Sequence, residues 1–249
     1  MTWLYFRGGF TGPRYSSTAG RNWIDYVRLV DGVTTQHVYY QRVDRVAVFI
    51  LAGGNSARMG KDKDKAFLRL GGETLLARAL ALAGAVTADV HIVGDAQKFL
   101  PYGSVVQDIY PGQGPLGGIH AALKSSSADL NLILAVDMPF VESRFLDYLL
   151  SSAGENSALV TVPHTEGRLQ PLCAVYRRDF AAVAEPALRE GKNKIDALFA
   201  QVQTRVIAEE ELRRMGCSTD MFRNLNTPAE FESAKRGTQT SEKTLRVDD

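Results

Sequence analysis

The sequence is poor in cysteine and has no long apolar run, and each of these absences excludes a class of protein. Its 249 residues include only two cysteines, Cys173 and Cys217, without a Cys-x-x-Cys spacing. A disulfide-stapled secreted domain and a thiolate zinc site are therefore not expected, and a reducing cytoplasm fits. No apolar stretch approaches the ~20 residues of a membrane-spanning helix, so we expect no membrane partner.

A surplus of charge of one sign is also missing. The 29 basic and 28 acidic residues leave a formal net charge of +1, so no global field attracts nucleic acid or an anionic membrane. The basic side chains can matter only locally. The histidines are scattered and do not pair at metal-ligand spacing, so structural or surface roles are expected for them: His37, His91, His120 and His164.

The two ends of the chain differ from its middle. Residues 1–44 are rich in aromatic side chains without a sustained period, and they lack the apolar core of a secretory signal. We expect a poorly ordered extension or a start codon placed too early. The alternatives are a docking strand or helix, or a separate domain, which so short a piece can hardly stabilise. Residues 45–236 are expected to form one domain, and residues 237–249 a loose polar tail.

Strand patterns alternate with helix patterns from Arg45 onward. Strands are expected over 46–51, 90–93, 104–107, 130–136, 158–162, 172–176 and 203–207. Helices are expected over 74–83, 116–124, 142–150, 179–190, 194–200 and 227–235. Continuous apolar runs such as 46–51 and 130–136 indicate fully buried central strands. The alternation predicts an α/β fold, three-layered and Rossmann-like, with a mostly parallel sheet.

A glycine-rich, basic segment follows the first of these strands. Residues 49–72 read FILAGGNSARMGKDKDKAFLRLGG. Gly53 and Gly54 allow the backbone to approach a phosphate, and Arg58 and Lys65 can neutralise its charge. The segment matches neither GxxxxGK[ST] nor GxGxxG. A surface turn with solvated lysines is the alternative, but the combination of features favours a polyphosphate-binding loop.

Two further segments lie at strand ends, where ligands bind in open α/β sheets. Residues 107–123 read QDIYPGQGPLGGIHAAL. There Gly117 and Gly118 allow close packing against a flat or anionic ligand, and Asp108 can accept hydrogen bonds from a ribose hydroxyl or a base edge. Residues 132–140 read LILAVDMPF, and Asp137 beside a polyphosphate is a natural Mg²⁺ ligand. The alternative for residues 107–123 is a purely structural loop, and the alternative for Asp137 is the N-cap of the following helix.

In this order, LAGGNSARMG, DKAFLRLGGETLL, GPLGGI, DMPF, QPLCAVY and NLNTPAE resemble the molybdenum cofactor guanylyltransferase (MobA) family of the nucleotidyltransferase superfamily. The similarity spans residues 45–234. The first motif alone is typical of the whole nucleotidyltransferase superfamily. LAGG together with GPLGGI and NLNTP narrows the resemblance to the guanylyltransferase family. Cytidylyltransferases acting on the same pterin typically read LAAG, so Gly53 favours guanine. The resemblance implies a nucleotide-diphospho-sugar-transferase-like fold.

The resemblance also implies an activity: GMP transfer from GTP to molybdopterin-bound molybdenum cofactor, with Mg²⁺, giving the guanine dinucleotide form of the cofactor and pyrophosphate. It allows for cofactor-biosynthesis proteins and recipient molybdoenzymes as further partners. A cytidylyl- or sugar-phosphate nucleotidyltransferase on the same fold is the closest alternative. A non-catalytic GTP-binding adaptor that delivers the cofactor is the other.

Site residues carry over from the family by motif. Leu51, Ala52 and Gly53 match the GTP-contacting segment, Lys65 the phosphate-binding lysine, and Asp108 the nucleotide-binding aspartate. Asp137 matches the ligand of GTP and Mg²⁺, and Asn224 and Asn226 match a motif near the pterin. Beside these, we expect Gly54 to contact the nucleotide and Arg58 to help Lys65 hold the triphosphate. The Asp-Lys pair is duplicated here, so Lys63 or Lys65 can be the functional lysine. We choose Lys65 because residues 66–68 continue the motif in register. Residues 1–44 have no counterpart in the family.

Overall fold

The computed structural model describes residues 14–18, 21–25, 28–30, 33–35, 45–53, 64–227 and 229–235. By its internal contacts the chain divides into two compact units, Met1–Arg45 and Val46–Asp249. In the first unit, β1 (Arg14–Thr18) pairs with β2 (Arg21–Asp25), and β3 (Arg28–Val30) pairs with β4 (Val33–Thr35), both antiparallel. The expected roles of an extension and a polar tail stay predictions.

The second unit is built on a mixed sheet. Among the described residues the sheet has eight strands, in the order β12-β11-β13-β10-β5-β8-β9, with β14 paired to β11. The strands are β5 (Val46–Leu51), β8 (Val90–Val93), β9 (Ser104–Val106), β10 (Leu130–Ala135), β11 (Val160–Thr165), β12 (Arg168–Leu169), β13 (Cys173–Tyr176) and β14 (Thr204–Ile207).

The strands from β10 to β9 are all parallel, whereas β13 runs antiparallel to both of its neighbours. Leu51, the last residue of β5, is in register with Val93 of β8 and Ala135 of β10. The carboxyl ends of these three strands are therefore flush. The chain crosses from β5 to β8 on one side and reaches β10 on the other, which is the kind of switch point where α/β sheets bind ligands.

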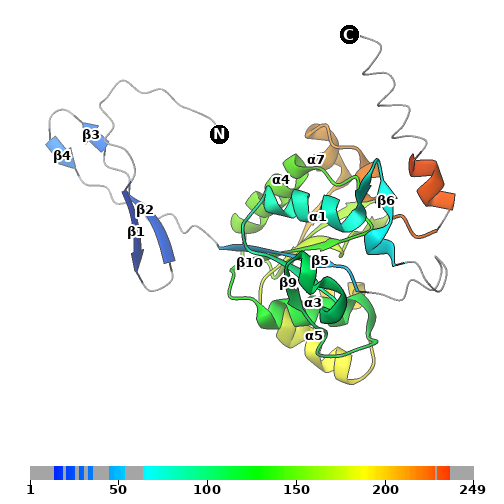
Figure 1. The fold of residues 1–249 in the computed structure, drawn as a ribbon. Helices are drawn as coiled ribbons and strands as arrows, with labels where there is room; N and C mark the ends of the chain where they lie inside the picture. Colours follow the sequence, from blue (N-terminus) through cyan, green and yellow to red (C-terminus); the bar gives the residue numbers. More distant parts are fainter. Residues whose placement is uncertain are drawn as a thin grey trace, which may run out of the picture. The chain divides into compact units, whose positions relative to one another are not determined.

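Helices cover both faces of the sheet (Figure 1). α1 (Leu75–Gly84) and α4 (Ser143–Gly154) pack with Val48 and Ile50 of β5 in one core layer. α3 (Gly114–Ser125) and α5 (Phe180–Arg189) pack with the alternate residues of β5 in the other. Each fully buried Val, Ile, Leu or Phe contributes about 1.5–3 kcal/mol. The expected three-layer α/β fold is confirmed.

Most expected elements are present, with shifted ends. Thr74 was expected inside the first helix and is instead its N-cap, accepting a hydrogen bond from Ala77 N at 3.1 Å. The last helix is described over 229–235. Several elements too short for a periodic pattern were not expected: α2 (Ala96–Phe99), α7 (Glu209–Arg214), the hairpin of β6 (Arg69–Leu70) and β7 (Glu73–Thr74), and the 3-10 turns η2 (Lys65–Phe67), η3 (Leu100–Tyr102) and η4 (Thr219–Phe222). The expected helix over 194–200 is the shorter α6 (Asp196–Phe199). Nowhere in the described ranges is a helix both long and apolar enough to cross a membrane.

One carboxylate joins three elements of the second unit. Glu211 of α7 accepts hydrogen bonds from both terminal nitrogens of Arg205 on β14, at 2.5 and 3.2 Å. It also accepts from Tyr148 Oη of α4 at 2.9 Å and from Ala208 N at 3.0 Å. The hydrogen bond from Arg205 is the largest cause that lowers the pKa of Glu211 from 4.5 to about 2.

We predict that Glu211→Gln destabilises the fold by about 1–3 kcal/mol at neutral pH, because charge-assisted hydrogen bonds are lost. The folded-state pKa is depressed, so the stabilisation is present above pH 4.5 and is lost as the pH falls toward 2. Free energies of unfolding between pH 7 and 2 measure this. The exposed neighbour Glu210 supplies the control Glu210→Gln. Equal stability of the two variants at pH 7 would contradict the prediction.

Candidate active site

Side chains from distant parts of the sequence line one cleft at the carboxyl ends of β5, β8 and β10. The cleft has a volume of about 630 Å³. Of the residues expected at the site, those that line it are Leu51, Ala52, Gly53, Lys65, Asp108, Asp137, Asn224 and Asn226. Gly54 and Arg58 lie outside the described residues. The structure therefore brings together most of the expected site, although its elements are up to 175 residues apart in sequence, from Leu51 to Asn226.

Lys65 is the centre of the polar contacts in the cleft. Its Nζ donates to Asp137 Oδ2 at 3.1 Å and to Asn226 Oδ1 at 2.6 Å. The side chains of Lys65 and Asp137 are only 20% and 18% exposed. Charges this shielded from water are costly unless they are paired. The lysine and the aspartate therefore compensate each other, and the asparagine oxygen satisfies a further donor of the ammonium.

The residue before Lys65 fixes where the lysine stands. Asp64 caps η2, since its Oδ1 accepts from Ala66 N at 3.0 Å. Its Oδ2 accepts from Lys98 Nζ of α2 at 2.7 Å. This second bond ties η2 to the element that follows β8. Lys63, the other candidate lysine, lies outside the described residues, so the choice of Lys65 over Lys63 stays a prediction.

The NLN segment reaches the same place from the other end of the chain. Leu225 N donates to the backbone oxygen of Asp137 at 3.0 Å. Asn226 N and Thr227 N both donate to Glu230 Oε2, at 2.7 and 2.8 Å, and these bonds lower the pKa of Glu230. Asn226 is thereby held against Lys65. Asn224 Oδ1 is buried and has no hydrogen-bond partner among the described residues.

Asp137 does not cap a helix. α4 begins at Ser143, after Glu142, and Asp137 lies in the turn that follows β10. The alternative interpretation of Asp137 as an N-cap is therefore wrong. Its carboxylate is the kind of hard oxygen ligand that Mg²⁺ takes, usually as one or two carboxylates together with substrate phosphates. The described residues contain no group of three or more side chains suited to a metal.

The N–H group of Gly53 is already used by the protein. Ala52 N and Gly53 N both donate to Val93 O at 3.0 Å. These two N–H groups are therefore engaged within the sheet edge. A Cβ at position 53 would have only ordinary contacts, 3.5 Å from Gly94 Cα. Among the described residues, none packs closely enough to require a glycine at this position.

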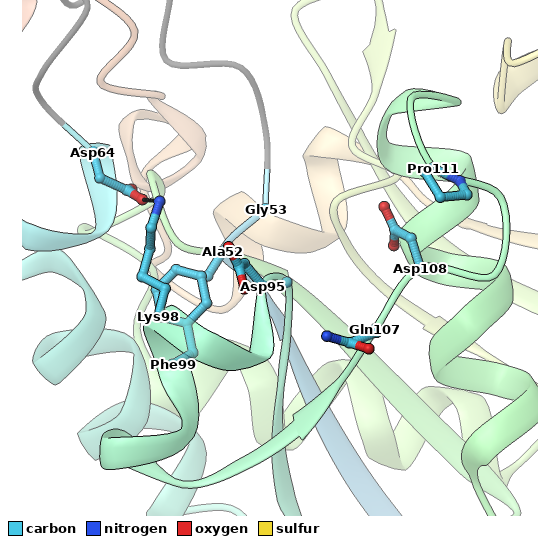
Figure 2. A pocket seen from close by; sticks show the side chains of 10 residues that line it. Ala52, Gly53, Asp64, Asp95, Lys98, Phe99, Gln107, Asp108 and Pro111 are labelled. Atoms are coloured by element: carbon cyan, nitrogen blue, oxygen red, sulfur yellow. Dashed lines mark hydrogen bonds and ion pairs between the residues drawn. The ribbon is translucent and has the colours of Figure 1, made fainter.

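A second lobe of about 470 Å³ adjoins the first and shares Ala52, Gly53, Asp64 and Asp108 with it. Figure 2 shows the Asp64–Lys98 pair on one side of this lobe and Gln107 with Asp108 on the other. Partial loss of hydration raises the pKa of Asp108. Asp95 also lines this lobe, and its Oδ1 caps α2.

Sequence reasoning missed Asp95, Lys98 and Gln107. Asp95 follows Gly94 at the end of the strand expected over 90–93. A carboxylate at the end of a strand could have marked it as a candidate. Lys98 and Gln107 carried no comparable signal.

The two glycines of GPLGGI differ in their surroundings. Gly118 lines the cleft, and a Cβ there would meet Leu51 Cδ2 at 3.3 Å and Val93 Cγ1 at 3.4 Å. Gly117, which was expected at the ligand, is not among the residues that line the cleft. A Cβ at Gly117 would stand 3.0 Å from the backbone oxygen of Tyr110. Gly117 thus allows the loop before α3 to pack on the helix.

The sheet order, the glycine-rich strand end and the lysine–aspartate pair together define a nucleotidyltransferase. The model of the MobA-like NTP transferase domain matches residues 48–206. The chain belongs to this family.

Named relatives agree with this assignment. The molybdenum cofactor guanylyltransferase of Desulfosudis oleivorans is 34% identical over 195 residues, which cover 78% of this chain and 96% of the relative. That of Syntrophotalea carbinolica is 31% identical, covering 75% and 89%.

Solved structures show the same fold. Molybdopterin-guanine dinucleotide biosynthesis protein A from Archaeoglobus fulgidus superposes with a TM-score of 0.70 at 26% identity, over 78% of this chain and 99% of that one. The 2-C-methyl-D-erythritol 4-phosphate cytidylyltransferase of Thermus thermophilus gives 0.57 at 19% identity, over 78% and 99%. The latter likeness is one of fold alone.

We predict that Gly117→Ala destabilises the protein by about 1–3 kcal/mol, because the added methyl group forces backbone apart. Gly84→Ala in α1 is the matched control. A Cβ there meets nothing within 4 Å, and Gly84 ends the helix, so this change should alter the stability by no more than about 0.5 kcal/mol. Chemical denaturation measures both. Equal effects at the two positions would show that the 3.0 Å approach at Gly117 is relieved without cost.

Proposed function

We propose that this protein transfers GMP from GTP to molybdopterin-bound molybdenum cofactor and releases pyrophosphate. The observation that carries the proposal is the meeting of Lys65, Asp137 and Asn226 in one cleft at the carboxyl ends of the parallel strands. The motifs that supply these three residues are those of the family. The named relatives supply the choice of substrates.

The reaction asks the protein for alignment and for neutralisation of charge. The terminal phosphate of the pterin attacks the α-phosphorus of GTP in line. A new P–O bond forms, and the bond to the β-phosphate oxygen breaks, so that pyrophosphate leaves. The attacking phosphate is already anionic near neutral pH, so no strong general base is needed. Holding the two phosphates in line and compensating their charge is sufficient, and no covalent enzyme intermediate forms.

Each residue of the cleft has a part in this scheme. Lys65 binds the triphosphate and balances charge on the departing pyrophosphate, with Arg58 as helper. Asn226 keeps the lysine turned toward the cleft, and Asp137 would hold Mg²⁺ against the phosphates. Bound there, the ion supplies charge stabilisation of several kcal/mol. Gly54 and the residues after it supply backbone donors to the phosphates.

The second lobe is assigned to the nucleoside. Guanine presents N–H donors on its base edge, and ribose presents hydroxyl donors. Asp95, Gln107 and Asp108 offer oxygen acceptors around this lobe. Gly117 supports Asp108 indirectly by letting its loop pack on α3. Asn224, with its unpartnered buried oxygen, is assigned to the pterin side together with Asn226.

The remaining parts of the proposal concern partners and location. Other cofactor-biosynthesis proteins and recipient molybdoenzymes are partners of such an enzyme, and no nucleic acid is needed. A cytoplasmic location is part of the proposal, and the buried free thiols Cys173 and Cys217 suit a reducing compartment.

The alternatives predict different products. A cytidylyl- or sugar-phosphate nucleotidyltransferase would use CTP or UTP, and a delivery adaptor would bind GTP without releasing pyrophosphate. Mass spectrometry of the product and a pyrophosphate assay with GTP, CTP and UTP separate these cases.

We predict turnover with GTP, and weak or no turnover with CTP. Gly53→Ala should fold normally, because the added Cβ makes only ordinary contacts, and its ratio of GTP to CTP turnover should fall. Gly84→Ala is the control and should keep the ratio. If the wild-type protein uses CTP as well as or better than GTP, the guanylyl assignment is wrong. GTP binding without pyrophosphate release would instead favour the adaptor.

We predict that Asp137→Asn leaves the protein folded but lowers turnover by about two orders of magnitude or more, with a higher Mg²⁺ requirement. Asparagine keeps the shape but removes the charge that a hard cation needs. Steady-state kinetics across a Mg²⁺ titration measure the effect. Asp147→Asn, a change at the outer side of α4, serves as the control. Normal turnover of Asp137→Asn at low Mg²⁺ would remove the centre of this mechanism.

A further inference from the structure

The loop between β9 and α3 carries Asp108 to the cleft, and Tyr110 is one of the residues that anchor it. On its backbone side, Tyr110 O lies 3.0 Å from where a Cβ of Gly117 would stand, and it accepts a hydrogen bond from Gln113 N at 3.4 Å. On its side-chain side, the phenol ring is half-buried and reaches α3 and α5. Two residues before it, the Asp108 carboxylate packs against α3, with Oδ1 3.6 Å from the position of a Cβ on Gly118.

The ring of Tyr110 rests on a buried histidine. The rings of Tyr110 and His120 meet edge to face, with centroids 5.2 Å apart and an interplanar angle of 69°. Edge-to-face aromatic contacts of this kind add to simple area burial. His120 is 1% exposed, and neither ring nitrogen has a hydrogen-bond partner among the described residues. Burying an imidazole without hydrogen bonds is energetically costly. Here the buried imidazole provides the surface on which the Tyr110 ring packs.

Charged groups of α5 hold the hydroxyl end. Tyr110 Oη donates to Glu185 Oε1 at 3.5 Å and accepts from Arg189 Nε at 3.4 Å. Glu185 and Arg189 are themselves paired at 2.6 Å, and Glu185 Oε2 lies 3.8 Å from His120 Nε2. Burial lowers the pKa of His120, Glu185 opposes this, and Lys124 reinforces it. A neutral imidazole under the ring, with the glutamate turned to the arginine, is consistent with these contacts.

We infer that Tyr110 is a positioning residue for the nucleotide site. Its ring, seated on His120 between α3 and α5, holds Asp108 at the cleft. The inference rests on the proposed function, since it takes Asp108 as a nucleotide contact. The ring carries the effect rather than the hydroxyl, because both hydroxyl contacts are long while the ring contact is close.

The test compares GTP affinity in the full chain for the wild type, Tyr110→Ala, Asp108→Ala and the double variant. Tyr110→Ala should weaken GTP binding about tenfold, because reordering even one loop residue on binding costs about that factor. In the Asp108→Ala background the same change should have almost no further effect. Tyr110→Phe should bind GTP within about twofold of the wild type, since a tenfold change needs 1.4 kcal/mol and the lost contacts are long. Leu100→Ala, at an exposed apolar residue outside both lobes, is the control.

Amide hydrogen exchange gives a readout that needs no nucleotide. Exchange of residues 107–113 should rise in Tyr110→Ala and stay unchanged in Tyr110→Phe, while α3 keeps its protection. Tyr110→Leu, which keeps apolar bulk, replaces the alanine variant if that variant does not fold, and should show the same direction.

Three results would overturn the inference. One is that Tyr110→Ala weakens GTP binding as much in the Asp108→Ala background as in the wild type. The others are wild-type GTP affinity of Tyr110→Ala, and unchanged amide exchange of residues 107–113 in that variant. Failure of the proposed function is distinguishable, because the wild-type protein would then not turn over GTP, whereas the exchange result would still decide the role of Tyr110.

Discussion

Parallel pairing of β5 with β8 and β10 is the constraint on which the rest of this site depends. Parallel strands in register end at the same edge, so the residue after each strand arrives at one place. Ala52 and Gly53, Gly94 and Asp95, and Val136 and Asp137 are brought together in this way. The two helical layers then bury both faces of the sheet. The chemistry is carried by turns and loops, but their positions are set by strand register.

Charge is balanced at this edge by partners from distant parts of the chain. Lys65 pairs with Asp137, and Asn226 completes the set. Two further carboxylates bind the backbone segments that carry Lys65 and Asn226. Asp64 caps the turn that presents Lys65, and Glu230 holds the backbone that presents Asn226. A polyphosphate with its cation would meet groups that already have fixed positions, which lowers the cost of ordering them on binding.

The second lobe of the cleft is organised differently. Its acceptors come from short segments after β8 and β9. The Asp64–Lys98 pair holds the first of these segments, and packing holds the second. Gly117 and Gly118 let the loop before α3 lie close to the helix, and Tyr110 fills the gap between α3 and α5. The lobe around Lys65 is thus held mainly by charge, whereas packing of the loop before α3 shapes the far side of the second lobe.

The fold class was predictable from the sequence, and so were many of the residues that line the cleft. Continuous apolar runs at 46–51 and 130–136 indicate central strands because residues buried on both faces must be apolar at every position. Asp137 was predictable as a site residue because a carboxylate at the end of such a strand needs a partner. The tertiary structure alone decided that β13 runs antiparallel, that Asn226 binds Lys65, and that Gly117 serves packing while Gly118 lines the cleft. These facts depend on contacts between segments far apart in the chain, and local patterns of hydrophobicity or turn residues carry no record of which segments will meet.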